Sequence, residues 1–223
     1  MKPPPGLMKF REAGSLLARF YRAFGKLGPR GPADGPKLMV IPGFLASDRT
    51  TLGLQRALAD AGFRVVGWGL GVNRGVSADV VDRIGREIER FGAGEKIVLV
   101  GWSLGGLYAR VVAQERPDIV EKVVTLGSPF SGDRRRNNNV WRLYEWVAGH
   151  PVNDPPIDKD PAKKPPVPTL AIWSRRDGIV AAAGARGRPE ERDAELEIDC
   201  SHMGFGVSGK AFPKIVEAVK RFS

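Results

Sequence analysis

The chain has 223 residues and a formal net charge of +10, from 35 Lys and Arg residues against 25 Asp and Glu residues. A chain of this length can bury one substantial hydrophobic core, and nothing in the sequence suggests a second domain or an internal repeat. Its single cysteine, Cys200, excludes an internal disulfide and is typical of a reducing compartment, so we expect a cytoplasmic protein.

Composition also argues against several classes of protein. The apolar run Leu16-Leu17-Ala18 is interrupted by Arg19, and no uninterrupted stretch has the length of an export or membrane-spanning segment. The basic excess makes an inactive, nucleic-acid-binding protein an alternative, but the charge is spread along the chain without a recognition motif, so we expect no nucleic-acid partner. No Cys/His cluster indicates a metal site and no Walker-type loop is present, so we expect no cofactor.

Residues 1–36 differ in character from the rest of the chain. A basic amphipathic helix is predicted at residues 8–27, followed by a linker rich in Pro and Gly. Such a helix can dock on its own domain, lie weakly on the anionic inner face of the membrane, or bind a partner. We expect docking on the domain. The apolar face comprises Phe10, Leu17, Phe20, Tyr21, Phe24 and Leu27.

From residue 37 onward, short apolar runs alternate with helical segments, a pattern typical of α/β proteins with a mostly parallel sheet. Strands are predicted at 38–41, 64–66, 97–100, 123–126, 169–173 and 194–198. Helices are predicted at 52–61, 77–91, 107–115 and 212–222. The pattern therefore predicts a small α/β domain with about six strands and helices on both faces of the sheet.

The most informative stretch is Gly101-Trp102-Ser103-Leu104-Gly105, which follows the strand at 97–100 and precedes a helix. A chain that turns sharply from strand to helix holds the central serine in a strained conformation, and only glycine fits at the two flanking positions. The turn presents the hydroxyl above the sheet. We therefore interpret Ser103 as a nucleophile.

A serine nucleophile requires a histidine base and an acid that orients it. His202 follows the strand at 194–198 and is expected on a loop at the carboxyl end of that strand, whereas His150 lies in a proline-rich stretch typical of a solvated loop. Asp177 follows the strand at 169–173, on the edge where open α/β sheets assemble their sites. Asp199 is too close to His202 along the chain to approach its ring easily. The remaining acids that we considered fall in an irregular segment: Asp133, Asp154, Asp158 and Asp160.

Acyl transfer also requires two N–H groups that bind the oxyanion of the tetrahedral intermediate. Leu104, at the helix start, is expected to supply one of them. The strand at 38–41 runs into Pro42-Gly43, so Phe44 is the candidate for the second N–H, with Leu45 as the alternative.

These motifs resemble those of the α/β-hydrolases, in particular bacterial esterases and lipases. The chain order Ser103, Asp177, His202 matches the order of the family's triad, and residues 123–132 resemble a stretch found in bacterial lipases. The chain departs from the family in having Pro42-Gly43 where many members have His-Gly. The resemblance implies an α/β-hydrolase domain at 37–223 and a carboxylesterase or lipase-like serine hydrolase with a catalytic triad and an oxyanion hole. We expect esters of short to medium acyl chains as substrates, with a thioesterase or an acyltransferase as alternatives on the same residues.

Residues 131–168 interrupt the pattern with a polar run and a proline-rich stretch, and in the family an insertion here forms a cap over the site. Apolar residues at helical spacing around Leu143 predict a short amphipathic helix in this cap. The helix either packs on the core or lines an acyl pocket, and its spacing favours neither. The candidate substrate-binding residues are Leu45, Trp102, Trp141 and Tyr144.

Overall fold

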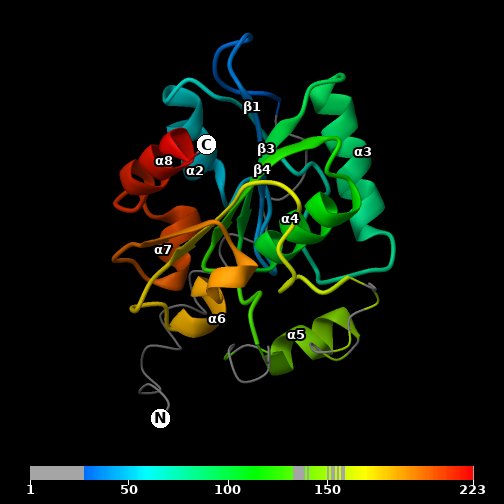
Figure 1. The fold of residues 1–223 in the computed structure, drawn as a ribbon, viewed down its shortest axis with the longest axis vertical. Helices are drawn as coiled ribbons and strands as arrows, with labels where there is room; N and C mark the ends of the chain where they lie inside the picture. Colours follow the sequence, from blue (N-terminus) through cyan, green and yellow to red (C-terminus); the bar gives the residue numbers. More distant parts are fainter. Residues whose placement is uncertain are drawn as a thin grey trace.

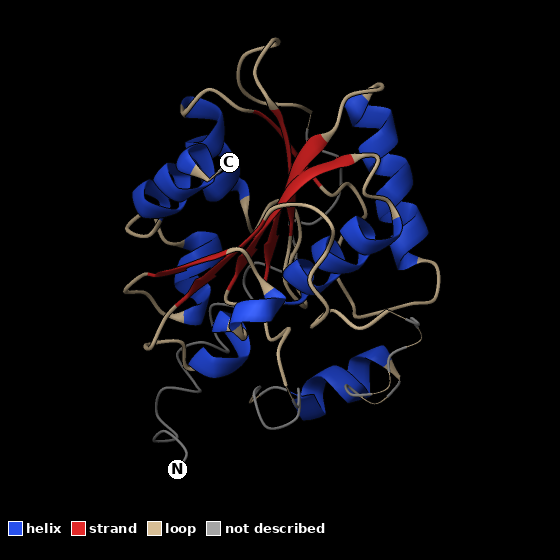
Figure 2. Ribbon diagram, viewed as in Figure 1, coloured by secondary structure: helices blue, strands red, loops and turns tan. Residues whose placement is uncertain are grey.

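A parallel sheet of six strands organises the molecule (Figures 1 and 2). The computed structural model describes residues 28–132, 139, 141–149, 151, 154, 156 and 159–222, without the side chains of residues 142, 144 and 146. Every neighbouring pair of strands is parallel, in the order β2-β1-β3-β4-β5-β6. The strands are β1 (Lys37–Ile41), β2 (Arg64–Gly67), β3 (Ile97–Trp102), β4 (Val120–Leu126), β5 (Thr169–Trp173) and β6 (Ala194–Glu197).

Helices cover both faces of this sheet, because the central strands are apolar on both sides. Successive residues of β3 enter different clusters: Ile97 and Leu99 pack on one face, and Val98 and Val100 on the other. The first face is covered by α3 (Val80–Gly92) and α4 (Leu104–Glu115). The second is covered by α2 (Leu52–Asp60), α7 (His202–Val207) and α8 (Phe212–Arg221), seen together on the left of Figure 1. Helix α5 (Trp141–Ala148) belongs to the cap segment, and the short α6 (Ala182–Arg186) contacts β5.

The predicted α/β-hydrolase fold is confirmed, with differences at the ends of elements. Helix α4 begins at Leu104 and not at residue 107, because it starts directly from the turn at Ser103. Helix α3 begins at Val80, since the Ser77 hydroxyl bonds the Asp79 carboxylate at 2.6 Å in a turn before it.

Helices α6 and α7 were not predicted. Both are short and contain glycine, which has low helix propensity. His202 is consequently the first residue of α7 and not a loop residue as expected. In the part of the chain that the structure describes, one isolated antiparallel bridge joins Arg30, which lies before β1, to Val65 of β2.

Parallel strands carry all their carboxyl ends to one edge of the sheet. Ser103 follows β3, Asp177 follows β5 and His202 follows β6. The topology therefore places all three predicted residues at the same edge, although they are far apart in the sequence.

Candidate active site

Ser103 occupies the sharp turn between β3 and α4. Its backbone has φ 53° and ψ −119°, a conformation that is costly for a residue with a side chain. The Ser103 N–H donates to the Leu126 carbonyl at 2.9 Å, which fastens the turn to the end of β4. Ser103 is partly exposed, unlike the buried residues on either side of it.

Gly101 and Gly105 allow the backbone to close around this turn. A Cβ atom on Gly101 would lie 2.4 Å from the backbone of Gly105 and Gly106, and one on Gly105 would lie 2.2 Å from the Ile41 carbonyl oxygen. These contacts are with backbone atoms, which cannot move aside as a flexible side chain could. Larger residues would therefore separate α4 from β3 and β1.

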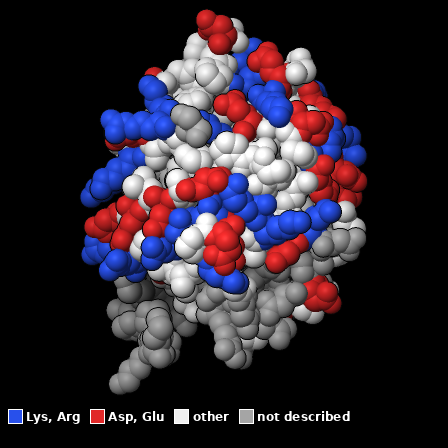
Figure 3. Space-filling model, in the orientation of Figure 1, with Lys and Arg blue, Asp and Glu red and all other residues white. Residues whose placement is uncertain are grey.

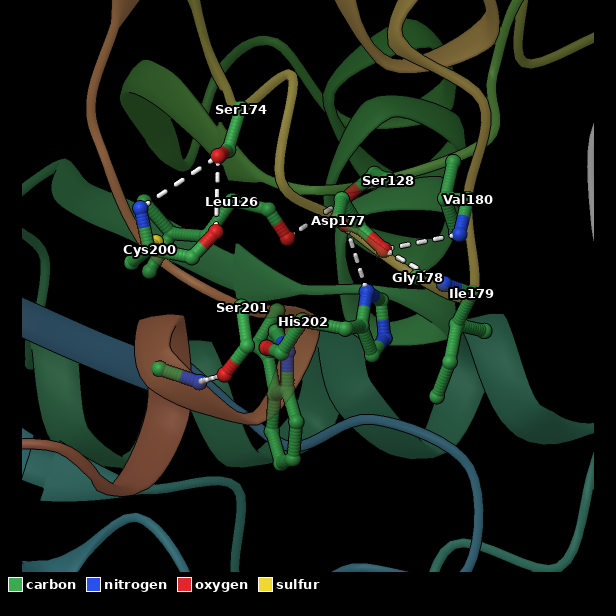
Figure 4. A network of polar contacts seen from close by, with 12 residues as sticks. Leu126, Ser128, Ser174, Asp177, Gly178, Ile179, Val180, Cys200, Ser201 and His202 are labelled. Carbon is green, nitrogen blue, oxygen red and sulfur yellow. Dashed lines mark hydrogen bonds and ion pairs between the residues drawn. The ribbon is translucent and has the colours of Figure 1, made fainter. Parts of the chain in front are cut away.

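Asp177 and His202 form a buried pair (Figure 4). The His202 Nδ1 and Asp177 Oδ2 atoms lie 2.7 Å apart, and the two side chains are 6% and 1% exposed. The other carboxylate oxygen, Oδ1, accepts hydrogen bonds from the backbone N–H groups of Ile179 and Val180, each at 2.8 Å. These two N–H groups hold the carboxylate in place, so it can fix the orientation of the imidazole and stabilise its protonated form.

Trp102 supports the histidine from behind. Its indole N–H donates to the His202 carbonyl at 3.1 Å, and the two rings lie 5.8 Å apart. Trp102 is only 3% exposed and contacts His202, and its expected part in substrate binding stays a prediction. Ser201 caps the start of α7 by accepting the Gly204 N–H at 3.3 Å.

Ser103 and the Asp177–His202 pair are connected through contacts of the residues next to them. Trp102 precedes Ser103 in the chain and contacts His202. Gly127 follows Leu126, whose carbonyl accepts the Ser103 N–H, and a Cβ atom on Gly127 would lie 3.0 Å from Asp177 Oδ2. Within the described part of the chain, no hydrogen bond joins the Ser103 hydroxyl to the His202 ring. In proteins without substrate such catalytic hydrogen bonds are often long and shorten when substrate binds.

The loop after β1 lies directly against Ser103. A Cβ atom on Gly43 would lie 3.2 Å from the Ser103 Cβ, which brings the backbone of residues 42–46 to the same place as the start of α4. Of the two candidate N–H donors in this loop, Leu45 already donates to the Asn73 carbonyl at 2.7 Å. The Leu45 N–H is therefore engaged within the fold, and Phe44 as the second oxyanion donor stays a prediction.

Ser174 is a site residue that sequence reasoning missed. Its hydroxyl donates to the Cys200 carbonyl at 2.7 Å and accepts the Cys200 N–H at 3.3 Å (Figure 4). It also accepts the backbone N–H of Arg176 at 3.1 Å. It thereby ties the loop of Asp177 to the loop before His202. No motif marks this serine in the sequence, because its role depends on a partner 26 residues away.

Comparison with known proteins supports the fold seen in the structure. A sequence profile described as "alpha/beta hydrolase fold" matches residues 73–158, which include the turn at Ser103. The structure of a lipase-esterase related protein from Clostridium acetobutylicum superimposes with a TM-score of 0.65 at 18% identity, covering 87% of this chain and 98% of that one. The chain has the α/β-hydrolase fold.

Other solved structures show how widely this α/β-hydrolase fold is shared. A carboxylesterase from Bacillus subtilis matches with a TM-score of 0.58 at 14% identity, covering 97% of each chain. A thioesterase domain from the curacin biosynthetic pathway matches with a TM-score of 0.62 at 13% identity, covering 86% of this chain and 93% of that one. Such identities establish a common fold and not a common substrate. No curated protein sequence matches this chain.

Residues 131–168, the predicted cap segment, contain the expected amphipathic helix, α5. Trp141 is partly buried against the core cluster that α3 and α4 share, whereas Leu143 is 45% exposed. Leu45 is half-buried in the loop after β1. The side chain of Tyr144 and all of His150 lie outside the described residues, so the acyl-pocket interpretation stays a prediction.

None of the helices in the described residues is long and apolar enough to cross a membrane. In the same part of the chain, no group of three or more His, Cys, Asp or Glu side chains is arranged to hold a metal ion.

Proposed function

We propose that this α/β-hydrolase is a serine hydrolase that cleaves carboxylic esters of short to medium acyl chains through Ser103, His202 and Asp177. The observation that carries the proposal is the buried Asp177–His202 contact of 2.7 Å beside a serine held on a strained turn. A histidine that takes the proton of a serine hydroxyl becomes positively charged, and a carboxylate held against its ring orients the ring and stabilises that charge.

In the first half of the reaction, His202 accepts the Ser103 proton as the hydroxyl oxygen attacks the ester carbonyl carbon. The negative charge that develops on the carbonyl oxygen is bound by the N–H groups of Leu104 and Phe44. Leu104 is the first residue of α4, where backbone N–H groups have no partner within the helix. The imidazolium then gives its proton to the leaving alcohol, and the acyl group remains on Ser103.

Water resolves the acyl-enzyme by the same route. His202 takes a proton from the water molecule, the resulting hydroxide attacks the acyl carbon, and the imidazolium returns the proton to the Ser103 oxygen. Asp177 orients the imidazole and stabilises it while it carries the proton. The reaction consumes no cofactor.

A thioesterase is the second candidate, because the same residues can cleave an acyl thioester. The similarity to the curacin thioesterase domain supports this alternative. An acyltransferase would differ only in the acceptor that attacks the acyl-enzyme, so both alternatives share the first half of the mechanism.

A covalent probe tests the nucleophile. A fluorophosphonate should label Ser103, and Ser103→Ala should abolish the labelling, because an activated serine beside an oxyanion hole attacks phosphorus readily. Ser128→Ala is the matched control, since this serine is fully buried at the end of the next strand and should not affect labelling. Labelling that survives Ser103→Ala contradicts the assignment.

A substrate panel then separates the candidates. We expect hydrolysis of p-nitrophenyl esters with a preference for short and medium chains, and weaker turnover of an acyl-CoA and of a peptide. Faster turnover of acyl-CoA than of every ester would replace the esterase assignment with the thioesterase.

A further inference from the structure

Asn73 lies in the segment between β2 and α3, is completely buried, and has no part in the triad. Three hydrogen bonds fasten it to the loop after β1. Its side-chain amide donates to the Pro42 carbonyl at 2.8 Å, its backbone N–H donates to the Ala46 carbonyl at 2.8 Å, and its own carbonyl accepts the Leu45 N–H at 2.7 Å. Residues 42–46, which carry the candidate oxyanion donor Phe44, are therefore held at three points by one residue.

The same side chain also reaches the helix of the nucleophile. Asn73 Oδ1 accepts the hydroxyl of Tyr108 at 3.2 Å, and Tyr108 lies one turn into α4, whose first residue is the other oxyanion donor, Leu104. Tyr108 is itself fully buried and stacks on Trp68 with 6.3 Å between ring centres. Asn73 thus connects the two backbone segments that must converge on one oxyanion.

The loop needs such support because its conformation is not the preferred one. Leu45 has φ 58°, in the left-handed region, which a branched apolar residue adopts only when its surroundings impose it. The bond from the Leu45 N–H to Asn73 is part of that constraint. Loss of the constraint would allow the loop to relax and to carry the Phe44 N–H with it.

We infer that Asn73 is a positioning residue for the oxyanion hole. It acts by fixing residues 42–46 relative to α4. The inference rests on the proposed serine hydrolase function. An amide is the side chain suited to this task, because it donates to the Pro42 carbonyl while it accepts from Tyr108 and from the Gly75 N–H at 3.2 Å. A carboxylate would place an acceptor against the Pro42 carbonyl.

The test compares Asn73→Ala with the unaltered protein, with active sites counted by fluorophosphonate so that misfolded molecules do not contribute. We expect kcat per active site to fall about 10-fold to 100-fold at unchanged KM, because oxyanion donors act in the transition state. A trifluoromethyl ketone analogue of the best ester forms an oxyanion on Ser103, so its Ki should rise by the same factor. A purely structural role would lower thermal stability and leave both quantities per active site unchanged.

Two further variants complete the design. Tyr108→Phe removes only the hydroxyl that reaches Asn73 and should produce a smaller change in the same direction, about threefold or more. Thr169→Val is the control for loss of a buried hydrogen bond: its hydroxyl donates to Val167 at 3.0 Å at the opposite end of the sheet, and kcat and Ki should stay unchanged.

The outcomes are distinguishable. If the unaltered protein is labelled and active but Asn73→Ala retains kcat and Ki per active site, the inference is wrong and the proposed function stands. If the unaltered protein is neither labelled nor active, the proposed function fails and the inference fails with it. If Asn73→Ala does not fold, Tyr108→Phe decides, because unchanged kcat and Ki in that variant overturn the inference.

Discussion

The chemistry proposed for this protein depends on a few side chains whose conformations are constrained from several directions. Ser103 is constrained by the strained turn, and Asp177 by two N–H groups on one carboxylate oxygen and an imidazole on the other. Rigid placement matters because the reacting groups then need little reorganisation when substrate arrives. A single substitution should therefore be enough to remove each of these constraints.

Substitution of the base or the acid should abolish most activity. We expect His202→Ala and Asp177→Asn each to lower kcat by about three orders of magnitude or more, because members of a triad act as a unit. Circular dichroism should show folding intact. His150→Ala serves as the control for loss of a histidine and should be nearly silent in the same ester assay. Loss of turnover in His150→Ala with activity retained in His202→Ala would mean that the base has been misassigned.

Cys200 should be chemically inert although it is close to the active site. Burial, together with the negative charges of Asp177 and Asp199, raises the pKa of its thiol from an ordinary 9.0 to about 12, so almost no thiolate exists near neutral pH. We expect iodoacetamide at pH 8 to modify the native protein far more slowly than the urea-unfolded protein, as measured by mass spectrometry. Equal rates in the two states would contradict the raised pKa.

The same shift has a consequence for stability. The folded state keeps the Cys200 proton at pH values where the unfolded chain has lost it. The free energy of unfolding should therefore decrease as the pH rises above about 9. Cys200→Ser should weaken this dependence, which urea unfolding at several pH values would measure.

At the scale of elements, Arg110 fastens the end of the predicted cap segment to helix α4. It lies in α4, is completely buried, and donates to the backbone carbonyls of Pro161 at 2.5 Å, Ala162 at 3.1 Å and Glu191 at 2.7 Å. Its guanidinium also lies 4.0 Å from the centre of the Phe130 ring. The end of the cap segment is thus attached to the helix that begins at the nucleophile.

Arg110→Met should destabilise the fold through these lost bonds. The substitution keeps an apolar stem of similar length but leaves several buried carbonyl groups without a donor, so we expect the free energy of unfolding to fall by about 3 kcal/mol. Urea unfolding monitored by tryptophan fluorescence would measure the change. A loss below about 1 kcal/mol would show that solvent replaces these bonds at little cost.

Elements with a strong local signal could be predicted from the sequence, and contacts between distant elements could not. The apolar run of β3 and the two glycines around Ser103 predict a strand, a turn and a helix without further information. His202 was correctly expected after the last strand, but the helix that begins at it was missed because its glycines disfavour helix. The roles of Asn73 and Ser174 arise only in the folded chain, since their partners Pro42 and Cys200 are far away in sequence.

At the scale of the whole molecule, the basic excess is not gathered into one patch on the face shown in Figure 3. Lys and Arg side chains alternate there with Asp and Glu side chains. Part of this mixing reflects ion pairs around β6, such as Arg186 with Glu195 at 2.6 Å and Arg175 with Glu197 at 3.0 Å. Interspersed charges of this kind do not form the continuous basic surface that binds nucleic acid.

Binding experiments should reflect this distribution. We expect no salt-sensitive binding to duplex or single-stranded DNA at physiological ionic strength, and at most weak sedimentation with anionic vesicles. Deletion of residues 1–27, which lie outside the described residues, should remove any vesicle binding without reducing hydrolysis of a soluble ester. Neutral vesicles are the control. Tight DNA binding by a protein that hydrolyses no ester or thioester would favour the inactive binding protein instead.

The order of strands in the sheet has a consequence for the synthesis of the protein. Strands β3, β4, β5 and β6 are neighbours in the sheet in the same order as in the chain, so each can dock on its predecessor as it leaves the ribosome. Ser103 emerges first, Asp177 much later and His202 last. Under the proposed mechanism, a nascent chain that has not yet added β6 holds the nucleophile without its base and is inert towards esters. Activity therefore begins only when the final strand of the sheet is in place.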